Sequence, residues 1–406
     1  MTTLYKGMNL FDGNDVVNVS DAWILVGDNG RIIAVGTGET PSENSLENKV
    51  AETVDLTGKY VMPGLINCHT HIMLDAYDPK LTMFSETEVA FRAIKHLKAL
   101  VDCGVTTIRE CASAFSVDCK LAALQRKGEL ADMPTIVPSG RSMSMTGGHG
   151  DMLMGLSGES NGSHLVDSPD EMRKAVREEF KLGAKNIKLM ATGGVMSATD
   201  QIDDTELTVA EMKVAVEEAH HKHMTVSAHA EGANGIHNAI VAGVDSIEHG
   251  AMIRDEDIEL MIANGQYLTP TLIACWAIPK YGEGKIPQFM VDKARGFEKD
   301  YFANIGKAAK AGVKFSMGTD AGTPFNDFGD TPYELVLMKQ VGCTTEQVLH
   351  ACGRNAADLL KISDDYGTLE PGKYADFLVL DADPIADVAA VGQKNKAVYK
   401  HGVRVH

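Results

Sequence analysis

Eight short apolar runs alternate with longer segments of helical periodicity from Val61 onward, and this alternation constrains the fold more than any other feature. The runs expected to be strands are Gly64–His71, Val105–Arg109, Thr135–Ser139, Asn186–Met190, Thr225–His229, Ser246–His249, Tyr267–Thr271 and Lys314–Asp320. Helices are expected at Phe84–Asp102, Ser168–Leu182, Thr205–His223, Asp255–Ala263 and Met290–Ala311. Such alternation is typical of parallel sheets, and eight units are the number in a closed barrel. The sequence therefore predicts an α/β protein with a (β/α)8 TIM barrel.

The two ends of the chain differ from this central part. Up to about Tyr60, closely spaced β-like runs are separated by Gly-containing turns, and similar runs return between Tyr366 and His406. We expect the two ends to pair into one small β-sandwich domain beside the barrel. The expected domains are therefore residues 1–60 plus 366–406 for the β-sandwich, and residues 61–365 for the barrel.

Charge and composition exclude several classes of partner. The 406 residues contain 38 Lys and Arg against 56 Asp and Glu, so the formal net charge is −18. A strongly acidic surface disfavours nucleic acids and anionic membranes, and no apolar run approaches the roughly 20 residues of a membrane-spanning helix.

The seven cysteines are scattered and never form C-x-x-C, which predicts a reducing, cytoplasmic environment. We also expect a homo-oligomer, which the apolar content of 44% permits.

The first expected barrel strand ends in Cys68-His69-Thr70-His71. Residues i and i+2 of a strand face the same side, so the imidazoles of His69 and His71 project together. The C-terminal ends of barrel strands carry the active site, and two imidazoles there can form half of a metal site. Taken alone, the pair could equally be two polar residues satisfied by their neighbours.

Three later strands also end in a potential metal ligand, namely His229, His249 and Asp320. A metal site in a barrel must draw its ligands from several strand ends, and chance placement at three further ends is improbable. Lys188 lies inside the apolar run Asn186–Met190, where an amine costs free energy unless it is paired, neutralised or modified. It could extend its amine out of the strand end, or react with CO₂ to give a carbamate that bridges two cations.

These residues, with Pro63-Gly64-Leu65-Ile66 before the His-x-His pair and with the β-domain made from both termini, resemble the amidohydrolase superfamily over essentially the whole chain. The segments Gly147-Gly148-His149-Gly150-Asp151 and Ile187 to Ser197 resemble its prolidase-like and imidazolonepropionase-related subgroup.

The resemblance implies a site for two divalent metal ions, expected to be zinc. One ion would be held by His69, His71 and Asp320, and the other by His229 and His249. A carbamate formed from CO₂ on Lys188, together with a hydroxide, would bridge the two ions.

The implied activity is metal-dependent hydrolysis of a carbon–nitrogen amide bond. The expected substrate is a small molecule, either a dipeptide of the Xaa-Pro type or an N-acyl amino acid. Asp320 would accept the proton of the attacking hydroxide and return it to the leaving amine.

The alternatives are hydrolysis of a cyclic amide as in imidazolonepropionase, deamination, and lactone hydrolysis. Related deaminases and ring-opening enzymes generally use one metal and lack a bridging lysine, so Lys188 argues against them. A non-enzymatic scaffold is disfavoured because all six presumed ligands are present.

Three further residues are candidates for contact with substrate. His149 lies in a Gly-rich loop and could stabilise the oxyanion or hold a substrate carboxylate; otherwise it is a surface histidine. Arg141 could grip a carboxylate with both arms of its guanidinium, or be an ordinary solvated arginine. Glu231 stands where many prolidase-like relatives have tyrosine, and its carboxylate would favour a substrate with an amine or cationic side chain. Asp200 could likewise contact substrate, although a role as a helix cap or a solvated residue is expected.

Overall fold

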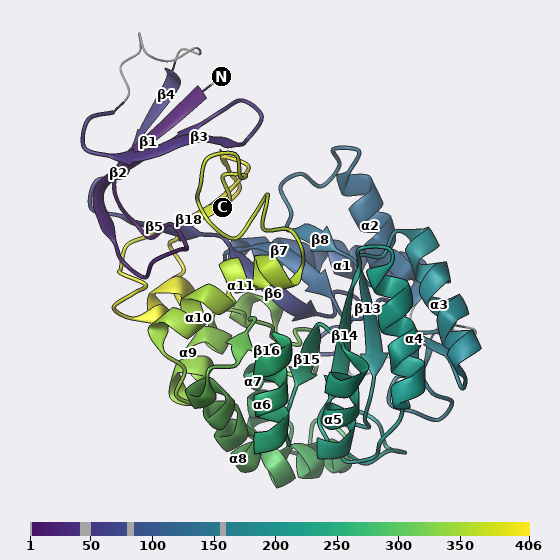
Figure 1. Cartoon of the computed structure of the whole chain (residues 1–406). Helices are drawn as coiled ribbons and strands as arrows, with labels where there is room; N and C mark the ends of the chain where they lie inside the picture. The colour runs from purple at the N-terminus through teal and green to yellow at the C-terminus, as the bar shows by residue number, and fades with distance from the viewer. Residues whose placement is uncertain (1, 41–49, 79–84, 155–159) are drawn as a thin grey trace.

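The computed structural model describes residues 2–40, 50–78, 85–154 and 160–406. It consists of a barrel surrounded by helices and a β-sheet domain that projects from one side of it (Figure 1). The predicted combination of a TIM barrel and a β-domain is confirmed.

The β-sheet domain joins the two ends of the chain. Its strands are β1 (Thr2–Leu10), β2 (Val19–Val26), β3 (Ile32–Thr37), β4 (Val50–Asp55), β5 (Tyr60–Pro63), β18 (Phe377–Leu380), β19 (Ala397–Lys400) and β20 (Val403–Arg404). The strand order is β20-β19-β18-β5-β1-β2-β3, with β4 also paired to β1. The antiparallel β5–β18 pair connects the N-terminal and C-terminal parts. Tyr5 packs edge-on against Phe377 and Tyr399, so aromatic side chains from both ends share one core.

All eight predicted barrel strands are present and parallel to their neighbours. They are β6 (Leu65–Thr70), β7 (Val105–Glu110), β8 (Thr135–Val137), β13 (Asn186–Met190), β14 (Thr225–Ala230), β15 (Ser246–His249), β16 (Tyr267–Thr269) and β17 (Lys314–Phe315). Regular pairing runs from β6 to β8 and from β13 to β17. Short strands β9 (Ser142–Ser144) and β12 (Ser163–Leu165) extend the second sheet beside β13.

Backbone hydrogen bonds close the barrel at the two gaps between these sheets. The Lys185 and Asn186 N–H groups donate to the Pro138 oxygen at 2.8 and 3.1 Å, which links β8 to β13. The Cys68 N–H donates to the Met317 oxygen at 2.7 Å, which links β6 to the segment after β17. The predicted last strand, Lys314–Asp320, therefore lies in the barrel wall along most of its length, although its regular pairing ends at Phe315.

The helices lie between the strands along the chain and cover the outside of the barrel (Figure 1). They are α1 (Glu86–Asp102), α2 (Val117–Gln125), α3 (Pro169–Leu182), α4 (Val209–His220), α5 (Ala233–Ala242), α6 (Asp255–Asn264), α7 (Leu272–Tyr281), α8 (Gln288–Ala311), α9 (Tyr333–Gln340), α10 (Thr345–Ala351) and α11 (Arg354–Leu359). The helix predicted from Thr205 begins four residues later, because the Thr208 side chain caps it by accepting from the Glu211 N–H. Phe84, the predicted start of the first helix, lies outside the described residues, and α1 follows the capping residue Ser85.

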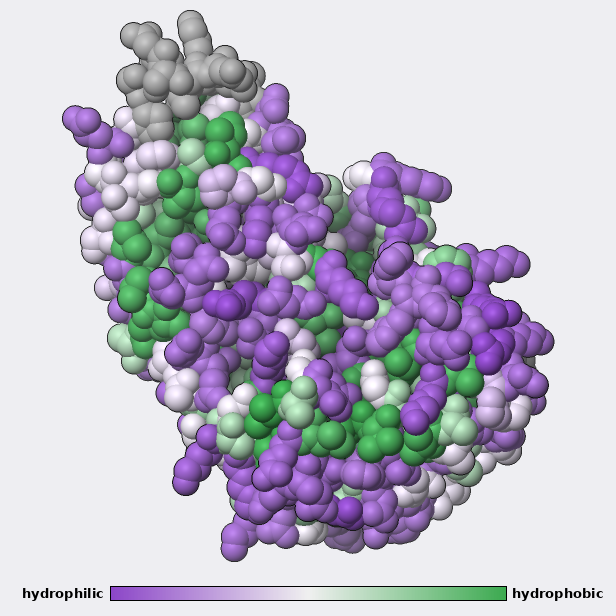
Figure 2. Space-filling model, viewed as in Figure 1, coloured by the Kyte–Doolittle hydropathy of each residue, from purple (hydrophilic) through white to green (hydrophobic). Residues whose placement is uncertain are grey.

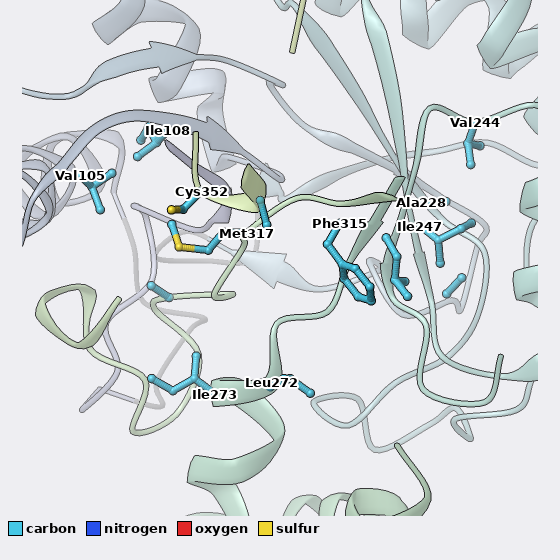
Figure 3. Packing of buried hydrophobic residues seen from close by; sticks show 14 of the residues in the cluster. Val105, Ile108, Ala228, Val244, Ile247, Leu272, Ile273, Phe315, Met317 and Cys352 are labelled. Carbon is cyan, nitrogen blue, oxygen red and sulfur yellow. The ribbon is translucent and has the colours of Figure 1, made fainter. Parts of the chain in front are cut away.

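The main core fills the space between strands and helices. Figure 3 shows Ala228, Ile247 and Phe315, from three different barrel strands, gathered in one region of this core. The surface in Figure 2 is mostly hydrophilic, as the net charge of −18 leads one to expect, with apolar residues gathered in a band across the barrel. Among the described helices, none has the length and apolar character needed to cross a membrane. All seven cysteines are buried free thiols.

Candidate active site

His69, His71 and Asp320 meet where β6 lies beside the segment that follows β17. The Nε2 atoms of His69 and His71 lie 3.2 and 3.0 Å from the same carboxylate oxygen, Oδ1 of Asp320. The alternation along β6 thus places both imidazoles on one side, as predicted. These three side chains offer ligand atoms close enough together to hold a single metal ion.

His229 and His249 approach the same point from β14 and β15. The His249 ring lies 4.7 Å from the ring of His229 and 5.0 Å from that of His69, measured between centroids. His249 and Asp320 both have positive φ values, 69° and 60°. A left-handed backbone is uncommon for residues other than glycine, although His and Asp adopt it more readily than most, and such conformations cluster at functional sites. The two residues end their strands in this conformation beside the other candidate ligands.

Each of these four histidines already uses one ring nitrogen in a contact with the surrounding protein. Nδ1 of His69 pairs with Glu248 at 2.7 Å, Nδ1 of His249 with the Thr271 hydroxyl at 2.7 Å, Nε2 of His229 with the Gly193 oxygen at 3.0 Å, and Nδ1 of His71 approaches the Ala112 oxygen at 3.5 Å. Such contacts orient the ring and leave its other nitrogen as a ligand, which is the usual arrangement around a bound metal.

Burial keeps three of the four imidazoles neutral, whereas contacts with Cys111 and Asp320 outweigh burial at His69 and raise its pKa to about 10. Desolvation lowers the pKa of His71 and lowers the pKa values of His229 and His249 well below the ordinary range. These imidazoles are therefore neutral near pH 7, and the neutral form is the one that binds a cation. Burial opposes ionisation of Asp320, but its hydrogen bonds to His69 and His71 outweigh that effect and hold its pKa well below the usual value.

Lys188 of β13 points into the same site. The residue is 1% exposed, and its Nζ lies 3.4 Å from Nε2 of His69. The structure therefore does not place this amine at the protein surface, which was the alternative interpretation of the sequence. The four imidazoles, the carboxylate and the Lys188 side chain form a donor set that suits divalent cations.

Sequence reasoning missed a buried charged network behind His69. The Arg109 guanidinium of β7 pairs with Glu248 of β15 at 2.7 Å, and both side chains are fully buried. The other carboxylate oxygen of Glu248 contacts Nδ1 of His69. Burial raises the pKa of a carboxyl group, but Arg109 and His69 outweigh this and lower that of Glu248. The sequence did contain a signal for this network, because Arg109 and Glu248 are charged residues within strands that are otherwise mostly apolar.

The four histidines, Asp320 and Lys188 line one cleft, which is partly open to solvent. The lining of the cleft includes the apolar side chains of Met190, Ile278 and Phe297. His149 and Glu231, both predicted to contact substrate, also line it. The Glu231 residue is 7% exposed, and its Oε2 atom has no hydrogen-bond partner among the described residues. Burial raises the pKa of Glu231 to about 8.

Arg141 does not lie among the residues that line the cleft. The chain turns after β8 so that the Arg141 guanidinium faces α3, where its Nε lies 3.3 Å from Glu179 and its Nη2 lies 2.8 Å from His164. Arg141 follows a predicted strand end closely in the sequence, but this position did not reveal that its side chain faces α3 and not the cleft. Its charge is used by a buried carboxylate instead of being free for a ligand.

Asp200 differs from its expected role as a helix cap or solvated residue. The residue is 4% exposed, and its Oδ2 lies 3.0 Å from Nδ1 of His149. The His149 ring stacks on that of His229 with centroids 4.5 Å apart. The loop carrying Asp200 is thus part of the wall that supports His149.

Comparison with known proteins agrees with this arrangement. The amidohydrolase family model matches residues 60–405. The ochratoxinase of Aspergillus niger is 31% identical over an alignment covering 98% of this chain and 84% of that protein. A crystal structure of a Xaa-Pro dipeptidase with bound methionine is 30% identical, has a TM-score of 0.89 and covers 100% of this chain and 99% of its own. A prolidase complexed with N-methylphosphonate-L-proline is 28% identical with a TM-score of 0.87, covering 100% and 99%. The chain belongs to the amidohydrolase family and is a hydrolase of that family.

Proposed function

We propose that this protein hydrolyses the amide bond of a dipeptide or an N-acyl amino acid with the help of two divalent metal ions, expected to be zinc. One observation carries the proposal: five candidate ligands from four barrel strand ends surround the buried amine of Lys188 in a single cleft. The names of the relatives support the same bond type, since a prolidase and a Xaa-Pro dipeptidase are among the structures similar to this chain.

His69, His71 and Asp320 would hold one ion, and His229 and His249 the other. A carbamate formed from CO₂ on Lys188 would contribute further ligand oxygens. When bound, the ions lower the pKa of water and polarise the carbonyl of the substrate. Glu248 and Thr271 hold the rings of His69 and His249 in orientation for this task.

Asp320 is the proposed proton carrier. Its carboxylate is ionised, since its pKa is lowered, and it lies at the centre of the site between His69 and His71. It would accept a proton from the attacking water and deliver it to the amine that leaves. Proton delivery is needed because an amide nitrogen leaves readily only when protonated.

Metal content tests the proposal directly. Protein purified without chelator should contain about two divalent ions per chain, and Lys188→Ala should lower both this number and the activity because the bridging group is lost. Elemental analysis and an assay against a library of dipeptides and N-acyl amino acids measure the two quantities. A metal-free protein that added zinc and bicarbonate leave inactive would contradict the metal site. Turnover of lactones alone would contradict the amide specificity.

Glu231 should discriminate between the two substrate classes. Glu231→Gln is expected to lower kcat/KM about 10-fold or more for dipeptides with a free amino group, and to change it much less for their N-acetylated forms. The reason is that the unpartnered Oε2 in the cleft can accept from an ammonium group, whose positive charge would favour the ionised carboxylate over the neutral form that burial favours in the empty cleft. Paired assays of each dipeptide and its N-acetyl derivative give the ratio. Equal losses for both forms would show that Glu231 does not contact the amine.

A further inference from the structure

Lys293 of α8 reaches across to the loop that follows β13 and is held there by several oxygen atoms. Its Nζ lies 2.8 Å from the Gly194 oxygen, 2.8 Å from the Ser197 oxygen and 2.6 Å from the Asp200 oxygen. An ammonium group has three N–H donors, so these carbonyls can use all of them. The side chain is only 13% exposed. Lys293 therefore fixes the shape of the loop between Gly194 and Asp200 from outside the cleft.

The Asp200 carboxylate connects this clamp to the cleft. Its Oδ1 accepts from the Gly194 N–H at 3.2 Å and lies 3.2 Å from Nζ of Lys293, while Oδ2 lies 3.0 Å from Nδ1 of His149. Burial opposes ionisation of Asp200, but His149, Gly194 and Lys293 together lower its pKa. An ionised carboxylate only accepts hydrogen bonds, so Nδ1 of His149 carries the proton in this contact.

The other ring nitrogen of His149 is left for the cleft. Gly194 lies directly beside it: a Cβ atom at this position would come within 2.8 Å of Nε2 of His149 and 3.0 Å of Cε1 of His229. The absence of a side chain at Gly194 thus keeps the space before Nε2 open. The backbone N–H of His149 is also fixed, because it donates to Glu206 at 2.7 Å. The ring is held on its backbone, at Nδ1 and by stacking on His229.

We infer that Lys293 and Asp200 are positioning residues for His149, holding its ring so that Nε2, in the imidazolium form in which both ring nitrogens are donors, faces the reacting carbonyl of the substrate. The inference rests on the proposed amide hydrolysis. It goes further by assigning a role to two residues that do not contact substrate and that lie 93 positions apart in the sequence. His149 stacks on His229, a candidate metal ligand, and so lies beside the place where the reacting carbonyl would bind. A displaced His149 should therefore affect the chemical step, and kcat should change more than KM.

A double-mutant cycle tests this inference. Asp200→Ala and His149→Asn are each expected to lower kcat about 100-fold with KM within about 3-fold, and the double variant should lose no more than either single one. Lys293→Met should lower kcat about 10-fold, and Lys293→Arg should restore most of it. Losses that multiply in the double variant would show that Asp200 does not act through His149.

A second readout does not depend on turnover. The hydrogen-bonded Nδ1–H of His149 should give a downfield proton NMR signal that is identified by its loss in His149→Asn. The signal should persist in Lys293→Arg and disappear in Asp200→Ala; its persistence in Asp200→Ala would overturn the inference. If the wild-type protein cleaves no amide, the proposed function fails, and the NMR result still decides the positioning role.

The chain offers a matched control pair outside the cleft. Asp257 is fully buried and lies 2.7 Å from Nδ1 of His237, much as Asp200 lies against His149. Asp257→Ala should leave kcat and the His149 signal unchanged. An equal loss of kcat in this variant would attribute the effect of Asp200→Ala to general disruption of the fold.

Discussion

Replacing Asp320 by Asn is expected to lower kcat for amide hydrolysis by about 1,000-fold, near the middle of the range for loss of a general acid–base group. Asparagine has nearly the same shape and retains one oxygen that can coordinate a cation. It cannot carry a proton between water and the leaving amine. The lowered pKa of Asp320 means that the wild-type residue is ready to accept a proton at neutral pH. The effect should therefore fall on the chemical step.

Steady-state kinetics of metal-loaded protein measure the effect, with elemental analysis of the same samples to separate proton transfer from loss of metal. Asp257→Asn serves as the control, because Asp257 is a buried aspartate outside the cleft. A fall in kcat of less than 10-fold at full metal occupancy would exclude Asp320 as the proton carrier. A fall that scaled with lost metal would make Asp320 only a ligand.

Replacing Arg109 by Met is expected to lower the free energy of unfolding by about 3–5 kcal/mol. The guanidinium pairs with Glu248 inside the barrel, where neither side chain is exposed, and it also donates to the Ser246 hydroxyl and to the Cys68 oxygen. Methionine fills similar space without the charge. Glu248 would then remain buried with only His69 to offset its charge, and a buried carboxylate that has lost one of its two charged partners is costly.

The loss should depend on pH in a defined direction. Glu248 has a folded-state pKa below its unfolded value of about 4.3, so its pairing contributes stability above that pH. This contribution disappears as the pH falls toward the lowered folded-state pKa. The difference in stability between wild type and Arg109→Met should thus be largest near neutral pH and shrink below about pH 4.

Chemical denaturation at several pH values measures this difference. Arg177→Met is a suitable comparison, because the Arg177 side chain is 60% exposed in its pair with Glu218 and its removal should cost about 1 kcal/mol or less. In a Glu248→Gln background the Arg109→Met change should cost less than in wild type, since no charge is left unpaired. Equal costs in both backgrounds would mean that Arg109 stabilises the barrel through packing alone.

Local sequence patterns determined the barrel and the positions of the candidate ligands. Alternation along a strand places His69 and His71 on one side, and the end of a parallel strand marks the active-site edge of a barrel. Both rules depend only on nearby residues, so His229, His249 and Asp320 could be assigned to the same edge before their distances were known.

Only the tertiary structure decided the partners of charged side chains. Arg141 contacts Glu179, Arg109 contacts Glu248, and Lys293 contacts the loop around Asp200. A charged side chain is long, and which acid or carbonyl it reaches depends on how distant elements pack. Burial then decides the protonation of groups such as Glu231, whose raised pKa no neighbouring residue in the sequence indicates. Strand periodicity is a local property of the backbone, whereas the environment of a charge is set by the whole fold.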